Sequence, residues 1–326
     1  MNPAMREVIG IDGGGTSTRA ALFRVNEDAE LGEIIRTASS GSANINSTSI
    51  DSVRTHFKEL IDKLAPENLF ATGLGVAGLS SPNAKEILQE ILLDLNYSNN
   101  IVIKGDHEIA LRGAFSRYAG ILLIAGTGSI AVAQTSSSIL RTGGYGYLLD
   151  DEGSAFDIGR QLLMAFIKAQ DMRRVQGPML LALEDELLSQ VNLAKEAINS
   201  QSKKKVVLEK IMNLAYAKDF DKAKIANLSK VFATFLERGD SLAEKIAENV
   251  VESLAQLVRG IFSQSSETFG KIVFAGGVLE KNEIICTRLE SKLSKEFPML
   301  KRVKARAGQV YGAADFAVEE YLCKTC

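Results

Sequence analysis

The sequence VIGIDGGGTSTRAALF, at residues 8–23, places three consecutive glycines between two apolar runs. The first run, residues 8–11, is short and ends in Asp12, which predicts a buried strand that enters a tight turn. A strand-like alternation resumes at 19–23, so the segment reads as a strand, a glycine turn and a second strand. It is not a P-loop, because the Gly-x-x-x-x-Gly-Lys-Ser/Thr spacing is absent and a strand follows where a P-loop has a helix.

The glycine turn has the composition of a phosphate-binding loop. Glycines allow backbone N–H groups to approach an anion closely, and Thr16 and Thr18 add hydroxyl donors. Asp12, at the end of the first strand, is the residue type that holds Mg²⁺ directly or through water at phosphate sites. Asp-Gly is also a common hairpin turn, so this motif alone leaves a plain hairpin as the alternative.

The same order of elements begins again in the second half of the chain. An apolar run at residues 121–124 leads into Gly126-Thr127-Gly128-Ser129, and a second run follows at 130–133. Two such turns at equivalent places predict a duplicated architecture whose loops face each other across a cleft and hold the two ends of a triphosphate. Gly276-Gly277, after the apolar run at 272–275, removes side chains where a flat ring could enter; its alternative is a helix-entry turn.

Periodicity places the other elements. Helical spacing of apolar residues is found near 50–64 and 87–95, and strand-like runs are found at 31–35, 70–77 and 101–103. The first block therefore reads as three strands followed by a helix, a strand, a helix, a strand and a helix.

The second half contains a long helical stretch, from about residue 155 to 262, before strand character returns. We expect one domain over residues 1–115 and a second over 116–307 with this helical insertion. The final helix, about residues 308–326, is expected to pack back on the first domain, and a ligand is expected in the cleft between the domains.

Composition narrows the class of protein. The chain has 326 residues with 38 Lys+Arg against 40 Asp+Glu, and 46% of its residues are hydrophobic, which predicts a folded protein of two domains. The balanced charge argues against nucleic acid as the main partner, and no apolar stretch is long enough to span a membrane. Three cysteines fit a reducing cytoplasm, and the Cys-x-x-Cys at 323–326 cannot complete a zinc site alone, so we interpret it as incidental thiols.

Taken together, these motifs resemble those of the BadF/BadG/BcrA/BcrD-type ATPases, and within that group the N-acetylglucosamine kinases and archaeal-type hexokinases. The resemblance runs in consistent order from about residue 7 to 320, and the segments that carry it are Ile11–Thr16, Gly126–Ser129, Gly143–Gly146, Asp151–Ser154 and Ala275–Val278. It implies an α/β fold of the duplicated RNase-H-like type found in sugar kinases, Hsp70 and actin, with two domains and an interdomain cleft.

The resemblance also implies roles for individual residues. Those implied to bind ATP and its Mg²⁺ ion, the latter through Asp12, are Asp12, Gly13, Gly14, Gly15, Thr16, Thr127, Gly128, Gly276 and Gly277. Those implied to bind a small-molecule sugar are Asn44, Asp106, Gly128, Tyr145 and Asp151. Asp106 matches the catalytic aspartate of the family. Similar proteins are commonly dimers, so a homodimer is consistent with the resemblance.

The chemistry supports Asp106 independently of the resemblance. A sugar primary hydroxyl is a poor nucleophile at neutral pH, so a kinase needs a carboxylate to orient it and accept its proton. Asp106 ends the strand 101–104, beside the predicted cleft. Its alternative is to cap the helix 107–114, a role that Asp also favours and that can coexist with catalysis.

Two positions depart from the family pattern. Tyr145 stands where the family often has Trp, and it can still stack on a sugar face. Asp150 stands where a glycine is usual, and its charge would suit a cationic amino sugar unless it points to solvent.

The sequence therefore predicts a cytoplasmic, ATP-dependent kinase that phosphorylates the 6-hydroxyl of an amino sugar or hexose, with N-acetylglucosamine foremost. Glucosamine, N-acetylmuramic acid and glucose stay open as substrates. The alternatives are a non-kinase ATPase that acts as a nucleotide-driven switch on a partner protein, and a sensing module without turnover. Asn44, Asp106 and Asp151 favour the kinase, because a switch has no need of polar groups that suit a sugar.

Overall fold

The computed structural model describes residues 6–26, 28, 30–79, 81–190 and 200–322. The chain forms two compact units: the first comprises Met1–Gly120, Gln134–Ser138 and Val303–Cys326, and the second comprises Ile121–Ala133 and Ile139–Arg302. The terminal Cys-x-x-Cys lies outside the described residues. Within the described part of the chain, no helix combines the length and the apolar character needed to cross a bilayer.

The first unit is built on a five-stranded sheet with the order β3-β2-β1-β4-β5. Its strands are β1 (Glu7–Gly13), β2 (Ser17–Val25), β3 (Leu31–Gly41), β4 (Leu69–Val76) and β5 (Ile101–Gly105). Strand β2 pairs antiparallel with both β1 and β3, while β1, β4 and β5 pair parallel. Strands β1, β3, β4 and β5 therefore all end at the same edge of the sheet.

The second unit repeats this arrangement. Its sheet has the order β10-β9-β6-β7-β8; read from the β8 edge, each strand number is that of the first sheet plus five. The strands are β6 (Gly120–Ala125), β7 (Ser129–Gln134), β8 (Ile139–Gly143), β9 (Lys271–Ala275) and β10 (Lys301–Arg302). The predicted duplicated α/β fold is confirmed. Neither β8 nor β10 was expected, because strands of five and two residues with exposed positions carry too short a pattern to read.

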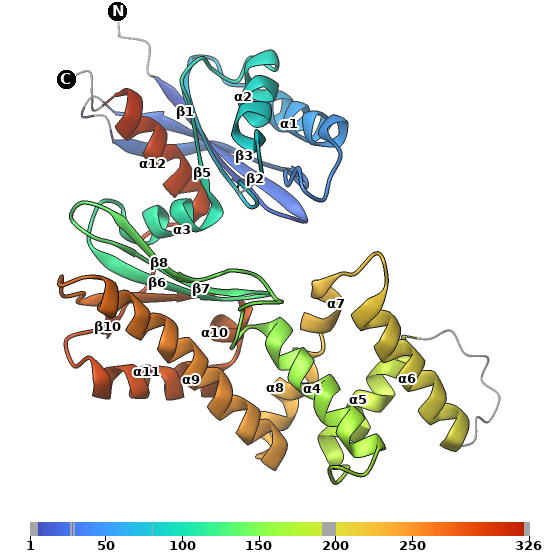
Figure 1. Ribbon diagram of the computed structural model, residues 1–326. Coiled ribbons are helices and arrows are strands. Elements are labelled where there is room, and N and C mark those ends of the chain that lie inside the picture. The colour runs from blue at the N-terminus through green and yellow to red at the C-terminus, as the bar shows by residue number, and fades with distance from the viewer. Residues whose placement is uncertain (1–5, 27, 29, 80, 191–199, 323–326) are drawn as a thin grey trace, which may run out of the picture. The chain divides into compact units, whose positions relative to one another are not determined.

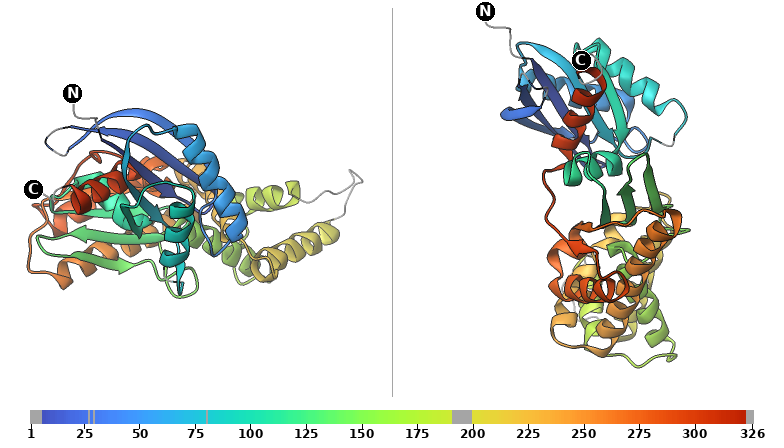
Figure 2. Two further views of the ribbon diagram at one scale, coloured as in Figure 1. Left: turned by 90° about the horizontal axis from the view of Figure 1, so that it is seen from above. Right: turned by 90° about the vertical axis from the view of Figure 1, so that its left-hand side faces the viewer.

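Helices cover both faces of the first sheet (Figures 1 and 2). On one face, α1 (Ile50–Leu64) and α2 (Ala84–Asp94) bury apolar side chains against the sheet, which confirms the two helices expected there. On the other face lies α12 (Gln309–Tyr321), and α3 (Asp106–Phe115) packs beside it. Gly73 makes this packing close, since a Cβ atom there would lie 1.8 Å from the carbonyl oxygen of Ala313.

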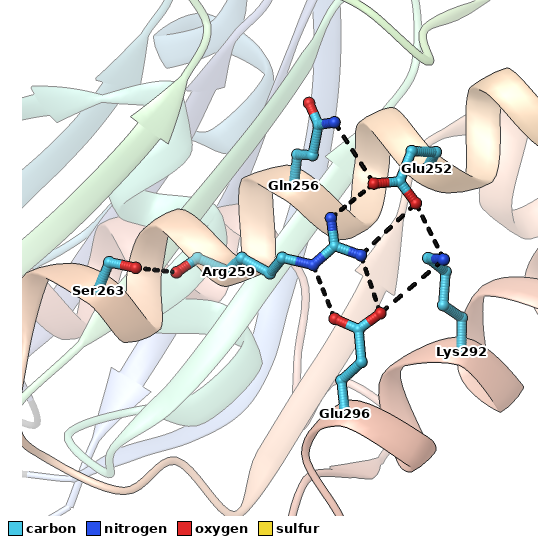
Figure 3. A network of polar contacts seen from close by, with 6 residues as sticks. All are labelled: Glu252, Gln256, Arg259, Ser263, Lys292 and Glu296. Carbon is cyan, nitrogen blue, oxygen red and sulfur yellow. Dashed lines mark hydrogen bonds and ion pairs between the residues drawn. The ribbon is translucent and has the colours of Figure 1, made fainter.

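The described residues between about 155 and 262 are mostly helical, as predicted. These helices are α4 (Ala155–Gln170), α5 (Pro178–Ser189), α6 (Ser200–Tyr216), α7 (Lys222–Ala226), α8 (Ser229–Glu237) and α9 (Ser241–Gln264) (Figure 1). Between β9 and β10 lie α10 (Gly277–Lys281) and α11 (Glu283–Glu296). An ion network joins α9 to α11: Arg259 contacts both Glu252 and Glu296, and Lys292 contacts the same two carboxylates (Figure 3).

Candidate functional site

Asp12 is a buried residue near the end of β1 in the first unit, and its carboxylate forms an ion pair with Arg19. The hairpin register places Asp12 opposite Arg19 on β2, and the Arg19 Nη2 atom donates to Asp12 Oδ2 at 3.0 Å. Burial raises the pKa of Asp12 and outweighs the lowering by Arg19; the nearby charge of Asp106 raises it further. Asp12 and Asp106 are therefore close enough for their charges to interact.

The glycine turn after Asp12 is a tight hairpin turn. The Gly14 N–H donates to the carbonyl oxygen of Ser17 at 3.1 Å, and a Cβ atom at Gly14 would lie 2.8 Å from that oxygen. Gly15 and Thr16 are exposed and available to a ligand. Thr18 is not, because it is buried and its hydroxyl donates to the Gly41 carbonyl at 2.7 Å. The expectation that Thr18 adds a ligand donor is therefore wrong.

Asn44 follows β3 and lies against this turn. Its Oδ1 atom accepts the Asn46 N–H at 2.9 Å, and its Nδ2 atom lies 4.0 Å from where a Cβ atom at Gly15 would be. The amide oxygen is thus partly committed to the loop, while the Nδ2 side faces the glycine turn. The structure brings Asn44 together with the Gly13–Gly15 turn at the shared carboxyl edge of the sheet.

Asp106 follows β5 at the same edge and is the first residue of α3. Its side chain is 49% exposed, and its Oδ1 atom accepts the His107 N–H at 2.8 Å and lies 3.3 Å from His107 Nδ1. Burial raises the pKa of Asp106, but the hydrogen bonds and charge of His107 outweigh it and leave the pKa below its ordinary value. The N-cap position is Gly105, whose N–H donates to Glu108, so the alternative capping role is not what Asp106 performs.

The first unit thus gathers Asp12, Asn44 and Asp106 at one edge of a mixed sheet, where open α/β sheets bind their ligands. The carboxylates are of the hard oxygen type that Mg²⁺ prefers. Among the described residues, no group of three or more His, Cys, Asp or Glu side chains is arranged to hold a metal. The carboxylate oxygens at this edge are donors that suit a Mg²⁺ ion whose remaining ligands are nucleotide phosphates and water.

In the second unit, the turn at Gly126–Ser129 is built around Asp151. The Ser129 N–H donates to Asp151 Oδ1 at 3.1 Å. A Cβ atom at Gly128 would lie 2.7 Å from the same oxygen, so only glycine fits beside this carboxylate. Thr127, at the tip of the turn, is exposed. The structure therefore brings together Gly128 and Asp151, which were expected to share a ligand.

The carboxylate of Asp151 is itself unusual. The residue is 3% exposed and adopts a positive φ of 66°, which is uncommon outside glycine. Its Oδ2 atom is buried and has no hydrogen-bond partner among the described residues. The nearest cation is Lys222 at the start of α7, whose Nζ atom lies 4.0 Å away.

Tyr145 projects from a loop rich in positive-φ glycines. Its side chain is 70% exposed, and the Arg141 guanidinium lies over its ring at 5.1 Å. Asp150 does not point to solvent alone, because its Oδ2 atom accepts the Tyr145 N–H at 3.1 Å. A pocket of about 260 Å³ lies against this loop, with Tyr145, Asp150 and Glu152 in its wall.

Gly276 brings the third glycine turn, Gly276-Gly277, close to the Gly126–Ser129 turn of the same unit. With a φ of +88°, it lies so close to the end of β6 that a Cβ atom would be 2.6 Å from the Ala125 carbonyl oxygen. Strands β6 and β9 are parallel, so both turns leave the same edge of the sheet. Gly277 is exposed, with no heavy atom within 4 Å of a Cβ position.

Sequence reasoning missed three residues that shape these sites. Arg19 could have been found, since a tight turn over Gly14–Ser17 fixes its register opposite Asp12. Asp157 accepts the Gly153 N–H at 3.1 Å and so holds the turn after Asp151. Lys222 lies far from Asp151 in the sequence, and no local pattern relates the two.

Comparisons with known proteins extend over nearly the whole chain. The model of the BadF/BadG/BcrA/BcrD ATPase family matches residues 9–317. An N-acetylmuramic acid/N-acetylglucosamine kinase from Clostridium acetobutylicum is 29% identical over 97% of this chain and 99% of its own length. An N-acetyl-D-glucosamine kinase from Dictyostelium discoideum is 26% identical over 95% of this chain and 97% of its own.

Solved structures with the same fold include proteins described as candidate N-acetylglucosamine kinases. A solved structure from Chromobacterium violaceum, described as a candidate N-acetylglucosamine kinase, superposes with a TM-score of 0.71 at 21% identity, over 97% of this chain and all of that one. The family match spans both sheets and every glycine turn described above. The chain belongs to the BadF/BadG/BcrA/BcrD ATPase family.

Proposed function

We propose that the protein is an ATP-dependent kinase that phosphorylates the 6-hydroxyl of an amino sugar, with N-acetylglucosamine as the foremost substrate. One observation carries the proposal: Asp106 is half-exposed, has a lowered pKa, and lies at the sheet edge that also carries Asp12 and Asn44. The full-length similarity to kinases of N-acetylated amino sugars supports the substrate class.

In this proposal, Asp106 acts as the general base. Its lowered pKa keeps the carboxylate ionised at neutral pH, so it is ready to orient a sugar hydroxyl and to accept its proton as the phosphoryl group is transferred. Because phosphoryl transfer needs positioning and charge stabilisation more than covalent chemistry, a single oriented carboxylate is a sufficient base.

The phosphates are assigned to the glycine turns. The exposed Gly15 and Thr16 of the first unit, and the exposed Thr127 of the second, present backbone and hydroxyl donors to them. When bound, Mg²⁺ would neutralise phosphate charge, and Asp12 is the residue we assign to hold it. Arg19, which now pairs with Asp12, would then be free to contact a phosphate oxygen.

The sugar is assigned to Asn44, Gly128, Tyr145 and Asp151. Tyr145 offers an exposed ring for stacking on a sugar face, and the unpaired Oδ2 atom of Asp151 offers an acceptor for a hydroxyl. Gly128 is included because it makes room for that carboxylate and adds a backbone donor beside it.

An ADP-release assay tests the proposal directly. We expect ATP turnover to rise by about tenfold or more when N-acetylglucosamine is added, because without an acceptor only water can take the phosphoryl group. The product should carry phosphate on its 6-oxygen by phosphorus–proton NMR. The panel should include glucosamine, N-acetylmuramic acid and glucose. Turnover that no sugar changes would contradict the proposal and favour the nucleotide-driven switch.

A further inference from the structure

The unpaired oxygen of Asp151 points to a second partner in the sugar site. A buried carboxylate oxygen without a donor is costly, and Lys222 at 4.0 Å is too far to hydrogen-bond to it. The Lys222 side chain is 45% exposed, so its ammonium group keeps donors for a ligand. The pair therefore offers one acceptor, on Asp151, and one charged donor, on Lys222, a short distance apart.

The backbone on both sides of Lys222 is anchored by packing. Phe220, two residues earlier, packs against Tyr147 with ring centroids 4.8 Å apart and also against Phe156. Tyr147 belongs to the loop that carries Tyr145, so this aromatic cluster joins that loop to the segment that leads into Lys222. Three residues after Lys222, α7 lies against α4, where a Cβ atom at Gly159 would be 2.1 Å from the Ile225 carbonyl oxygen.

We propose that Lys222 is a specificity-determining residue that selects sugars bearing an acceptor substituent, an N-acyl carbonyl or a carboxylate, over sugars bearing a free amine. This inference rests on the proposed function and names its substrate class. In it, the sugar donates a hydroxyl to Asp151 Oδ2 and accepts from Lys222 Nζ through the substituent.

Charge explains the selection against an amine. Lys222 offsets the charge of Asp151, while Asp150 accepts the Tyr145 N–H, so the cation beside the proposed hydroxyl acceptor is Lys222. A protonated amine in place of the acceptor substituent would be repelled by the Lys222 ammonium. It also could not accept a hydrogen bond from Lys222 Nζ. The order of preference is therefore N-acetylmuramic acid and N-acetylglucosamine before glucosamine.

The test is titration calorimetry of the full chain with N-acetylglucosamine and glucosamine, together with ADP-release kinetics. Lys222→Gln is compared with Lys224→Gln, an exposed lysine two residues further along the same helix. We expect Lys222→Gln to weaken N-acetylglucosamine binding about tenfold relative to glucosamine, with the ATP KM unchanged. Lys222→Arg, which keeps the charge, should keep most of the selectivity. Lys224→Gln should leave the affinity for both sugars unchanged.

The outcomes separate this inference from the proposed function. If Lys222→Gln left the ratio of the affinities for N-acetylglucosamine and glucosamine unchanged, the inference would be overturned and the kinase activity would stand. Binding of the sugars by the wild-type chain without phosphoryl transfer would overturn only the kinase activity. Wild-type protein that binds no sugar would overturn both.

Discussion

At the scale of single residues, Gly128 is the position whose lack of a side chain has the clearest consequence. The Asp151 carboxylate occupies the space that a Cβ atom would take, at 2.7 Å from Oδ1 and 2.9 Å from Oδ2. Gly128→Ala must therefore displace Asp151. We expect kcat/KM for the sugar to fall at least tenfold, about the loss of one hydrogen bond to a charged group, measured by initial rates.

The matched control is Gly270→Ala, at a glycine with no atom within 4 Å of its Cβ position and far from both glycine turns in the sequence. It should leave kcat/KM and the melting temperature unchanged. If Gly128→Ala kept wild-type kcat/KM, Asp151 would not be a sugar ligand.

His107 sets the protonation of the proposed base. Its hydrogen bonds and charge lower the pKa of Asp106, and burial opposes them. Asp106 is thus ionised at and above its ordinary pKa of 3.8, and its contribution is lost only as pH falls below that value. His107→Phe removes the imidazole's share of this lowering while burial remains, so the acid limb of the kcat/KM profile should shift to higher pH.

Profiles of kcat/KM from pH 4 to 8 for both proteins measure this shift. Superimposable profiles would mean that His107 does not tune the base. The backbone N–H of residue 107 is retained in the variant, so the comparison isolates the imidazole.

Residues differ in how far their role could be predicted from the sequence. Asp12 and Asp106 each end a short apolar run, and parallel strands bring their carboxyl ends to one edge, so a local pattern predicts their proximity. Thr18 carries a hydroxyl that could serve a ligand, but in the fold this hydroxyl donates to the Gly41 carbonyl. That is a tertiary contact, which no local pattern predicts. Lys222 meets Asp151 only through the packing of the helical insertion, and no spacing encodes that.

At the scale of elements, α9 and α11 are joined by the ion network around Arg259 (Figure 3). Hydrogen bonds from Arg259 and then Lys292 lower the pKa of Glu252 to about 2. Because the unfolded chain titrates near 4.5, the stabilisation is present above that pH and is lost as pH falls towards 2. The side chains are about a third exposed, so screening keeps the network's contribution at about 1 kcal/mol or less.

Arg259→Gln should therefore lower the free energy of unfolding by about 1 kcal/mol at pH 7, and the difference from wild type should narrow between pH 5 and pH 2. Urea denaturation across this pH range measures it. A difference that stayed constant with pH would mean that the charges contribute no stability, and that Arg259 acts through packing alone.

Elements with long periodic patterns were predictable, and short edge elements were not. The apolar spacing of α1 and the run of β6 follow from the sequence, because each buries one continuous face or core segment. Strand β8 alternates between exposed and half-buried positions before its buried last residue, and it forms at the sheet edge beside β7, in contact with α9. β10 has only two residues and exists through its pairing with β9.

At the scale of the whole molecule, the duplication is the organising fact. Both sheets have the same strand order, and each carries a glycine turn between its first two strands. The second copy differs by the helical insertion between β8 and β9, which supplies Lys222 to the second unit. The repeated glycine turns made this architecture predictable, whereas the residues that tune specificity lie in the part that is not repeated.

Phosphoryl transfer by Asp106→Asn, with nucleotide binding measured on the same sample, tests the central claim most directly. Asparagine keeps the size of the side chain and cannot accept the hydroxyl proton. At saturating ATP and N-acetylglucosamine, we predict that the kcat of the variant falls at least a hundredfold, the lower end of the effect of a general base, while its affinity for ATP stays within about twofold of wild type. A variant that phosphorylates the sugar at the wild-type rate would contradict the assignment of Asp106 and, with it, the reaction proposed for this site.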